Sequence, residues 1–128
     1  MLRLDAIGVV VSDMARAITF YRHLGLEFEE GAEDQPHTEA LVTGGIRLML
    51  DTEATVTSFS DWEPPFGGSP RIALAFLCDD AGEVDLSYRR LLDAGGSGQV
   101  EPFDAPWGQR YATVHDPDGN AVDLFAHR

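Results

Sequence analysis

Trp107 is the side chain of this sequence whose type and setting best suit the binding of a small molecule. It lies between Pro106 and Gly108, in a loop that leads into a strand predicted over residues 109–115. An indole in such a loop can stack on a planar quinone or heteroaromatic ring, and this contact contributes roughly 0.5–1.5 kcal/mol beyond the area that it buries. A tryptophan that only covers its own loop is the alternative, and the sequence leaves both interpretations open.

Asp51 and three further side chains could complete such a site. Asp51 ends the strand predicted over 46–51, where it could accept a hydrogen bond from a ligand amine or carbamate, or simply begin a turn. Arg110 and Tyr111 lie in the strand after the tryptophan loop and could line a cleft, but the loop leaves the strand parity open. Trp62, in a proline-rich segment, could belong to a lid, to a dimer contact or to ordinary packing.

The elements that would position these side chains follow from hydrophobic periodicity and from turn residues. The first half is predicted to hold a strand over 2–11, a helix capped by Ser12 or Asp13 and ended by Gly25, a short strand over 26–30, and a hairpin over 38–51 that turns at Gly44 and Gly45. The second half is predicted to hold a strand over 71–79, a helix over 83–94, strands over 100–103, 109–115 and 121–126, and a tight turn over 116–120.

The two halves repeat one architecture, so an α+β fold of two βαβββ repeats is predicted. Proline and glycine between residues 52 and 70 rule out a regular element there in this interpretation. We therefore expect a single domain over 1–128, with repeat one at about 1–52, a linker over 53–70 and repeat two over 71–128. Two repeats of this kind, each half-covered by its own helix, can place their open sheet faces together and enclose a cleft.

Strand alternation predicts which side chains face that cleft. The larger apolar set of each strand should pack under a helix; in 71–79 this set is Ile72, Leu74, Phe76 and Cys78, and Cys78 would be a buried, unreactive thiol. The cleft side then carries Ala6, Gly8 and Val10; Arg47, Met49 and Asp51; Ala73, Ala75 and Leu77; and Ala121, Asp123 and Phe125. Small side chains leave room for a bulky ligand, although they could also serve only to let two sheets approach.

The charge of the chain narrows the classes of partner. Nine arginines and no lysine face 22 acidic residues, and the formal net charge is −13. Nucleic acid and anionic membranes would be repelled, whereas a cationic small molecule would be attracted at long range; the charge could equally serve solubility alone. No apolar run reaches the roughly 18 residues that cross a bilayer, and the N-terminal alternation is not that of a signal peptide, so a cytoplasmic protein is expected.

Several motifs, by their order and spacing, resemble the glyoxalase/bleomycin-resistance/extradiol-dioxygenase superfamily, whose fold is called vicinal oxygen chelate. They lie at 13–17, 20–26, 79–80 and 116–120, and the resemblance covers 2–126. Within the superfamily, the stretches 36–40, 44–48, 51–52, 107–112 and 123–126 are most similar to the mitomycin-binding resistance proteins. This likeness implies a homodimer that holds an antibiotic in a cleft without degrading it. It also implies that His37 stacks on the ligand opposite the tryptophan, with an ordinary exposed histidine as the alternative.

The resemblance also implies where the enzymes of the superfamily hold a divalent metal. Their ligand positions correspond to Ala6, Met49, Ala73 and Asp123, of which only Asp123 carries an acidic group. A catalytic zinc, nickel or iron site needs at least three protein ligands. We therefore expect no metal and no cofactor, and interpret Asp123 as a hydrogen-bonding residue of the cleft wall.

These observations favour a homodimeric protein that gives resistance by sequestering a planar, mitomycin-like antibiotic. No catalytic residue is predicted, and the residues predicted to contact the ligand are His37, Asp51, Trp107, Arg110, Tyr111, Met49, Asp123 and Trp62. The alternative is a metal-dependent lyase or dioxygenase with His37, Asp51 and Asp123 as unorthodox ligands. A scaffold domain with a degenerate cleft is the third possibility.

Overall fold

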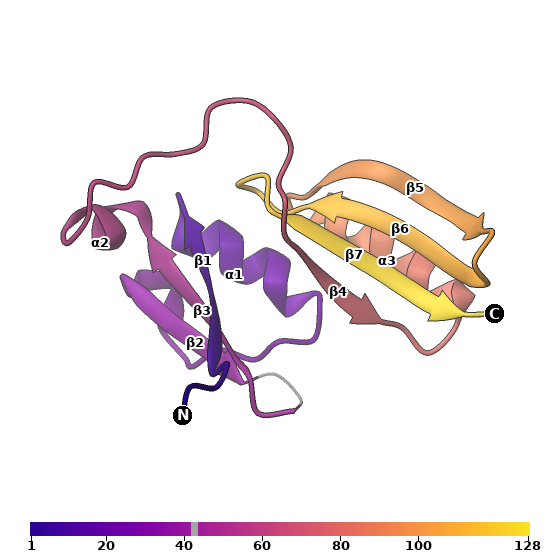
Figure 1. Cartoon of the computed structure of the whole chain (residues 1–128), viewed down its shortest axis with the longest axis horizontal. Coiled ribbons are helices and arrows are strands. Elements are labelled where there is room, and N and C mark those ends of the chain that lie inside the picture. The colour runs from indigo at the N-terminus through magenta and orange to yellow at the C-terminus, as the bar shows by residue number, and fades with distance from the viewer. Residues whose placement is uncertain (42–43) are drawn as a thin grey trace. The chain divides into compact units, whose positions relative to one another are not determined.

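The computed structural model describes residues 1–41 and 44–128 and divides into two units, Met1–Gly67 and Gly68–Arg128 (Figure 1). Each unit packs a helix against one side of a mixed sheet, which confirms the predicted α+β class. The division falls inside the segment predicted to be a linker. Among the described residues, no helix is both long and apolar enough to span a membrane.

The first unit is built around a three-stranded sheet in the order β1-β3-β2, with β1 parallel and β2 antiparallel to β3. Asp13 caps the first helix as predicted, because its side chain accepts a hydrogen bond from the Arg16 backbone N–H at 3.0 Å. The elements of this unit are β1 (Ala6–Val11), α1 (Met14–Arg22), the 3-10 helix η1 (Ala32–Asp34), β2 (His37–Leu41), β3 (Arg47–Thr52) and α2 (Glu53–Thr57). The predicted hairpin is thus present, and residues 42–43 near its turn lie outside the described residues.

The strand predicted over 26–30 is wrong: this stretch is part of a loop. The loop is anchored on α1, since Ala32 is buried and Arg22 Nη1 lies 2.6 Å from Glu33 Oε1. Within the described residues, no backbone hydrogen bond joins 26–35 to β2. Because a strand needs a hydrogen-bonded neighbour and this segment is held by a helix instead, β2 remains the free edge of the sheet.

The segment predicted to lack regular structure begins with the short helix α2. Thr52 caps it, since its hydroxyl oxygen accepts a hydrogen bond from the Thr55 N–H at 3.2 Å. Glu53 adds a negative charge to the first turn, where the helix dipole favours it. The helix was missed because the prolines that mark the segment begin only at Pro64.

The second unit contains every predicted element, and its four-stranded sheet has the order β4-β7-β6-β5. Its elements are β4 (Ala73–Leu77), α3 (Ala81–Asp93), β5 (Ser97–Ala105), β6 (Gln109–His115) and β7 (Ala121–His127). The Asp80 side chain accepts a hydrogen bond from the Glu83 N–H at 2.8 Å, and the Glu83 carboxylate accepts one from the Asp79 N–H at 3.0 Å. This reciprocal pair starts α3 and explains the doublet at 79–80.

Burial alternates along the strands, so each sheet has a helix-covered face and an open face. Val122 and Leu124 are buried while Asp123 between them is partly exposed, and the same alternation holds around Met49 in β3. The expected parity is therefore confirmed for these strands. Ile72 is an exception: it was predicted under the helix but is 79% exposed, because β4 begins one residue later.

Cys78 follows β4 and is 7% exposed. Burial, together with the nearby Glu83 carboxylate, raises the pKa of its thiol to about 11. The thiolate is the nucleophilic form, and a thiol with this pKa keeps its proton at neutral pH. Cys78 is therefore a structural residue, in agreement with the prediction.

Asp116 organises the turn between β6 and β7 and is itself 2% exposed. Its carboxylate accepts hydrogen bonds from the backbone N–H groups of Asp118 (2.9 Å) and Asn120 (2.8 Å), and from the Asn120 side-chain amide (2.8 Å). A buried carboxylate that receives several donors holds the two strand ends together.

We expect Asp116→Ala to lower the free energy of unfolding by about 2–4 kcal/mol, because it leaves these donors without an acceptor. Asp116→Asn keeps one acceptor oxygen and should cost clearly less. Urea denaturation of the three proteins measures both effects. A loss for Asp116→Ala within about 0.5 kcal/mol of wild type would show that the turn forms without this carboxylate.

Candidate functional site

The open face of the first sheet carries a chain of charged side chains. Asp51 Oδ1 lies 2.6 Å from His37 Nδ1, and His37 Nε2 lies 3.0 Å from Glu39 Oε2. Arg47 donates from Nη1 to the same Glu39 oxygen at 2.6 Å and from Nη2 to Asp5 at 2.6 Å. The antiparallel register brings these residues together, since His37 is paired with Asp51 across β2 and β3. Two predicted site residues therefore do meet.

Both ring nitrogens of His37 are engaged by carboxylates. Hydrogen bonds that the imidazole makes to the Asp51 carboxylate, and then to that of Glu39, raise its pKa above the usual 6.5. The side chain is 42% exposed, so its ring remains accessible although its nitrogens are occupied. An imidazole with both nitrogens bound to carboxylates is poorly suited to act as a general base, but its flat face can pack on a ligand ring.

Met49 lies between the neighbouring strands on the same open face. Its partners across the sheet are Gly8 on β1 and Glu39 on β2, and a Cβ atom placed on Gly8 would lie 3.7 Å from the Met49 Cε atom. Met49 is thus half-buried between a glycine and a glutamate, and a thioether occupies the place where the resemblance implies a carboxylate.

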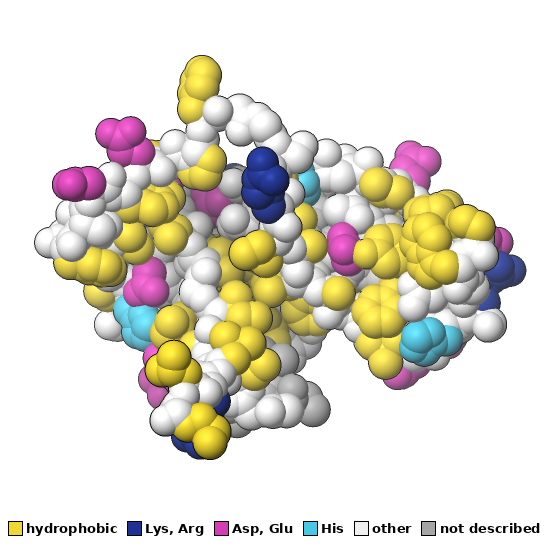
Figure 2. Space-filling model, viewed as in Figure 1, with side chains coloured by type: hydrophobic (Ala, Val, Ile, Leu, Met, Phe, Trp, Pro, Cys, Tyr) yellow, Lys and Arg dark blue, Asp and Glu magenta, His cyan; other side chains and the backbone are white. Residues whose placement is uncertain are grey.

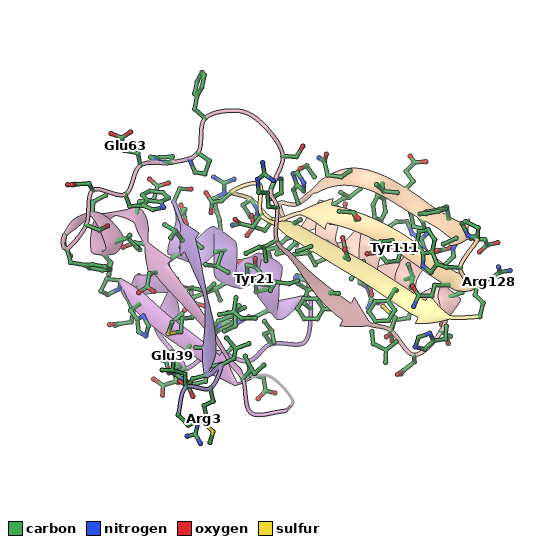
Figure 3. The ribbon with its side chains drawn as sticks, in the orientation of Figure 1. Arg3, Tyr21, Glu39, Glu63, Tyr111 and Arg128 are labelled. Carbon is green, nitrogen blue, oxygen red and sulfur yellow. The ribbon has the colours of Figure 1, made fainter. Side chains whose placement is uncertain are left out.

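The open face of the second sheet is largely aromatic. The register aligns Phe103, Tyr111, Phe125 and Leu77 in one row across β5, β6, β7 and β4. Hydrophobic side chains accordingly cover this face in Figure 2, and Figure 3 shows Tyr111 on the side of the sheet away from α3. A row of partly exposed apolar side chains, on the face of a sheet away from its own helix, is typical of a binding surface.

Trp107 extends this aromatic face. Its ring centroid lies 5.7 Å from that of Tyr111 and 6.1 Å from that of Phe103, both edge to face. The indole N–H donates to the Gln109 side-chain oxygen at 2.8 Å, yet the residue is 60% exposed. These contacts fix the position of the indole, and part of its ring surface remains exposed to solvent.

Asp123 borders the aromatic row and is fully engaged by its neighbours. Tyr111 donates its hydroxyl to Oδ2 at 2.5 Å, and Thr113 donates to Oδ1 at 2.8 Å. Burial and then the Asp123 carboxylate raise the pKa of Tyr111 to about 12. Tyr111 is thus a stable hydrogen-bond donor, and Asp123 positions it.

Arg110 and Trp62 differ in their surroundings from the other residues predicted to bind the ligand. Arg110 precedes Tyr111 on the strand, so its side chain lies on the opposite, helix-covered side of the sheet. Its guanidinium donates hydrogen bonds to the Asp85 carboxylate of α3 at 2.9 Å and 3.1 Å, and to the Asp104 carboxylate at 3.1 Å. Trp62 is partly buried in the first unit. Within the described part of the chain, its indole makes no hydrogen bond or ring contact with another predicted site residue.

Three residues of these faces were missing from the predicted site. Glu39 follows His37 by two positions, so strand alternation would have placed it beside a predicted residue. Arg47 precedes Met49 by two and was placed on the cleft side, but it was not counted among the residues that contact the ligand. Phe103 could not be placed in the same way, because register shifts interrupt the pairing of β5 with β6.

The residues present do not fit a divalent metal of the kind that the superfamily's enzymes use. The corresponding positions hold the side chains of Ala6, Met49 and Ala73, and the remaining carboxylate, Asp123, accepts hydrogen bonds on both oxygens. Nowhere among the described residues do three His, Cys, Asp or Glu side chains gather closely enough to hold a metal ion. These positions therefore lack the three protein ligands that a catalytic metal site needs.

Comparison with known proteins establishes the family. The model of the glyoxalase/bleomycin resistance protein/dioxygenase superfamily matches residues 3–124, so this chain belongs to that superfamily. An uncharacterised protein of Mycobacterium bovis is 30% identical over 122 residues, which are 91% of this chain and 78% of the relative.

Solved structures agree with the fold. A glyoxalase-related enzyme from Fulvimarina pelagi has a TM-score of 0.82 at 19% identity, over 99% of this chain and 89% of that one. A glyoxalase/bleomycin resistance protein/dioxygenase family enzyme from Burkholderia phytofirmans has a TM-score of 0.78 at 17% identity, over 99% and 100% of the two chains.

His37 should titrate above the usual histidine range in an NMR experiment. A raised pKa means that the folded protein binds the proton more tightly, so the stabilisation is fully present below about pH 6.5 and is lost as the pH rises through the folded-state pKa. Asp51→Asn should lower the pKa of His37 and reduce this pH dependence. Glu27→Gln, which removes an exposed acid elsewhere in the unit, should leave it unchanged; equal pKa values in all three proteins would contradict the geometry.

Proposed function

We propose that this chain binds a planar, antibiotic-like small molecule, such as a mitomycin-type quinone, and holds it without changing it chemically. The observation that carries the proposal is the aromatic open face of the second sheet, with Trp107 60% exposed at its border. Aromatic side chains give a large contact area for a flat ring and lose little conformational entropy on binding.

His37 supplies a second ring to the proposed ligand. Its nitrogens are held by Asp51 and Glu39, so the imidazole is fixed in orientation before any ligand arrives. A ring that is already oriented can stack on a flat ligand ring with little further loss of conformational entropy. Asp51 Oδ2, which accepts no hydrogen bond from the described residues, is the proposed acceptor for a ligand amine or carbamate.

The polar residues of these faces support binding rather than turnover. Both His37 nitrogens are engaged by carboxylates, and each oxygen of the Asp123 carboxylate accepts a hydrogen bond, one from Tyr111 and one from Thr113. A general base needs both a suitable pKa and reach to the proton that it removes. These side chains are instead hydrogen-bonded to one another, which does not favour proton abstraction from a ligand.

Resistance by sequestration is stoichiometric, so the proposed affinity is micromolar or better, about −8 kcal/mol. A homodimer is part of the proposal, because the antibiotic-binding proteins that this sequence resembles usually share their cleft between two chains. Sedimentation equilibrium of the purified protein tests the dimer independently of any ligand.

Trp107→Ala should weaken binding of mitomycin C at least tenfold, about 1.4 kcal/mol, because it removes the exposed ring. Trp107→Phe keeps a smaller ring and should lose less. Trp62→Phe is the matched control and should bind as wild type does, and it also makes Trp107 the only indole, so its quenching reports binding directly. Calorimetry measures all four affinities.

Whether both rings contact one ligand is decided by combining Trp107→Ala with His37→Ala. Losses that fail to add would show that the two side chains act on the same bound molecule. Unchanged affinity in both single variants, with the fold intact by circular dichroism, would reject the stacking proposal.

The alternative is a metal-dependent lyase or dioxygenase, and the close pairing of His37 with Asp51 is the observation in its favour. A metal ligand must be a neutral imidazole, whereas the pKa of His37 is raised. Elemental analysis of the purified protein separates the two candidates. A transition metal bound at one per chain would favour the enzyme.

A further inference from the structure

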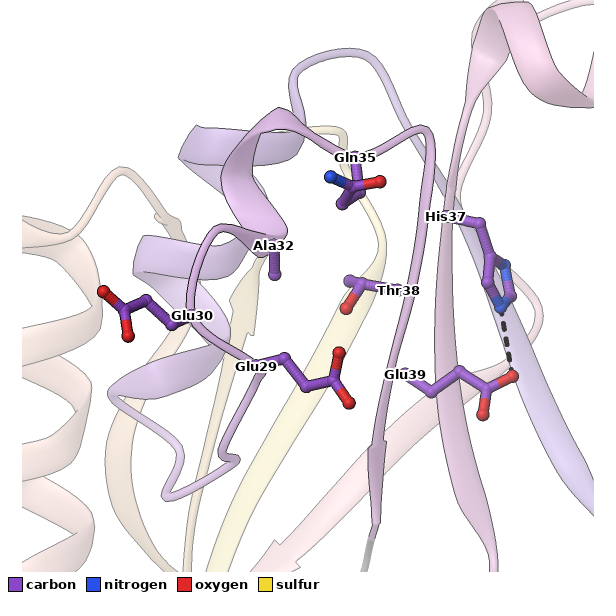
Figure 4. A pocket seen from close by; sticks show the side chains of 7 residues that line it. All are labelled: Glu29, Glu30, Ala32, Gln35, His37, Thr38 and Glu39. Carbon is purple, nitrogen blue, oxygen red and sulfur yellow. Dashed lines mark hydrogen bonds and ion pairs between the residues drawn. The ribbon is translucent and has the colours of Figure 1, made fainter.

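A pocket of about 360 Å³ lies in the first unit, between the loop before β2 and the free edge of that strand (Figure 4). It occupies the place that β5 fills beside β6 in the second unit, where a strand pairs with the sheet edge. The lining residues are Glu29, Glu30, Ala32, Gln35, His37, Thr38 and Glu39. A volume of this size is enough for a small organic molecule.

Thr38 lines this pocket and offers a hydroxyl to a bound molecule. The residue is 8% exposed, and its hydroxyl forms no hydrogen bond within residues 1–41 and 44–128. No buried side-chain oxygen or nitrogen of the described residues lacks a hydrogen-bond partner, so the Thr38 hydroxyl keeps access to the open space of the pocket and can bond to a molecule there. Figure 4 shows the Thr38 hydroxyl and the Glu29 carboxylate directed into the same space from opposite walls.

The acidic side chains that line the pocket favour a positively charged ligand. Glu29 forms no ion pair or side-chain hydrogen bond among the described residues, in contrast to Glu33, which is held by Arg22, and Glu39, which is held by Arg47. The chain has no lysine, so no internal side-chain ammonium can neutralise Glu29. The net charge of −13 adds a long-range attraction for any cationic ligand.

We propose that this pocket binds the primary ammonium group of a small organic cation, with Glu29 as the anionic partner and Thr38 as a hydrogen-bond acceptor. An ammonium has three donors and no acceptor, so a carboxylate, a hydroxyl and the Gln35 side-chain oxygen match it in kind. A metal ion is not the occupant, since the described residues contain no group of three ligating side chains. The site is separate from the aromatic face and does not rest on the function proposed above.

The probe is n-butylammonium, titrated at constant ionic strength into the full chain while backbone amide shifts are followed by NMR. We expect a saturable shift at Ala32, Gln35 and Thr38, with a Kd of about 1 mM or lower. Tetramethylammonium carries the same charge without donors, and 1-butanol carries a donor without charge. Both should bind at least about fivefold more weakly.

Glu29→Gln should weaken n-butylammonium binding at least about fivefold, and Thr38→Val at least about threefold. Glu30→Gln is the matched control: it removes the same charge from the adjacent residue, whose carboxylate points away from the pocket in Figure 4, and should change the Kd less than about twofold. Equal losses for Glu29→Gln and Glu30→Gln would overturn the proposal, because binding would then reflect net charge alone. A shift that does not saturate, or equal binding of tetramethylammonium, would overturn it as well.

Discussion

Each sheet of this protein has a helix on one side only, and this asymmetry governs where every other group can lie. The fully buried side chains under α1 or α3 are apolar and closely packed, as Leu50 and Val122 are, while the partly exposed Arg110 is paired there with Asp85. The residues that alternate with them are free of that requirement. On the first sheet they form an ion-pair chain through His37, and on the second they form an aromatic row through Tyr111. Both candidate binding surfaces therefore follow from the alternation of side chains between the two faces of a strand.

Local patterns in the sequence were sufficient for most of the fold. Capping at Asp13, the turn at 116–120 and the parity around Met49 and Asp123 all depend on neighbours within a few residues, so they were correct. The strand over 26–30 failed for a different reason. Its residues suit a strand, but the loop that follows is fixed to α1 through Glu33, and no local pattern reports that contact.

The candidate site was harder to predict, because it depends on register and on partners distant in sequence. His37 and Asp51 were proposed separately, and only the antiparallel pairing of β2 with β3 shows that they form one unit. Arg110 and Tyr111 were proposed together, yet adjacent residues on a strand face opposite sides, and the anchor of Arg110 is Asp85, 25 residues away. The pocket beside Thr38 had no sequence signal, since it exists where a strand is missing.

The buried thiol described beside β4 gives the protein a built-in reporter. Cys78 is the single cysteine of the chain, and in the folded state it is both shielded and protonated. A maleimide added to the native protein would therefore spare it and label only a thiol engineered on the surface. Slow labelling of Cys78 itself would then time the transient opening of the second unit, with no change to any residue of the binding faces.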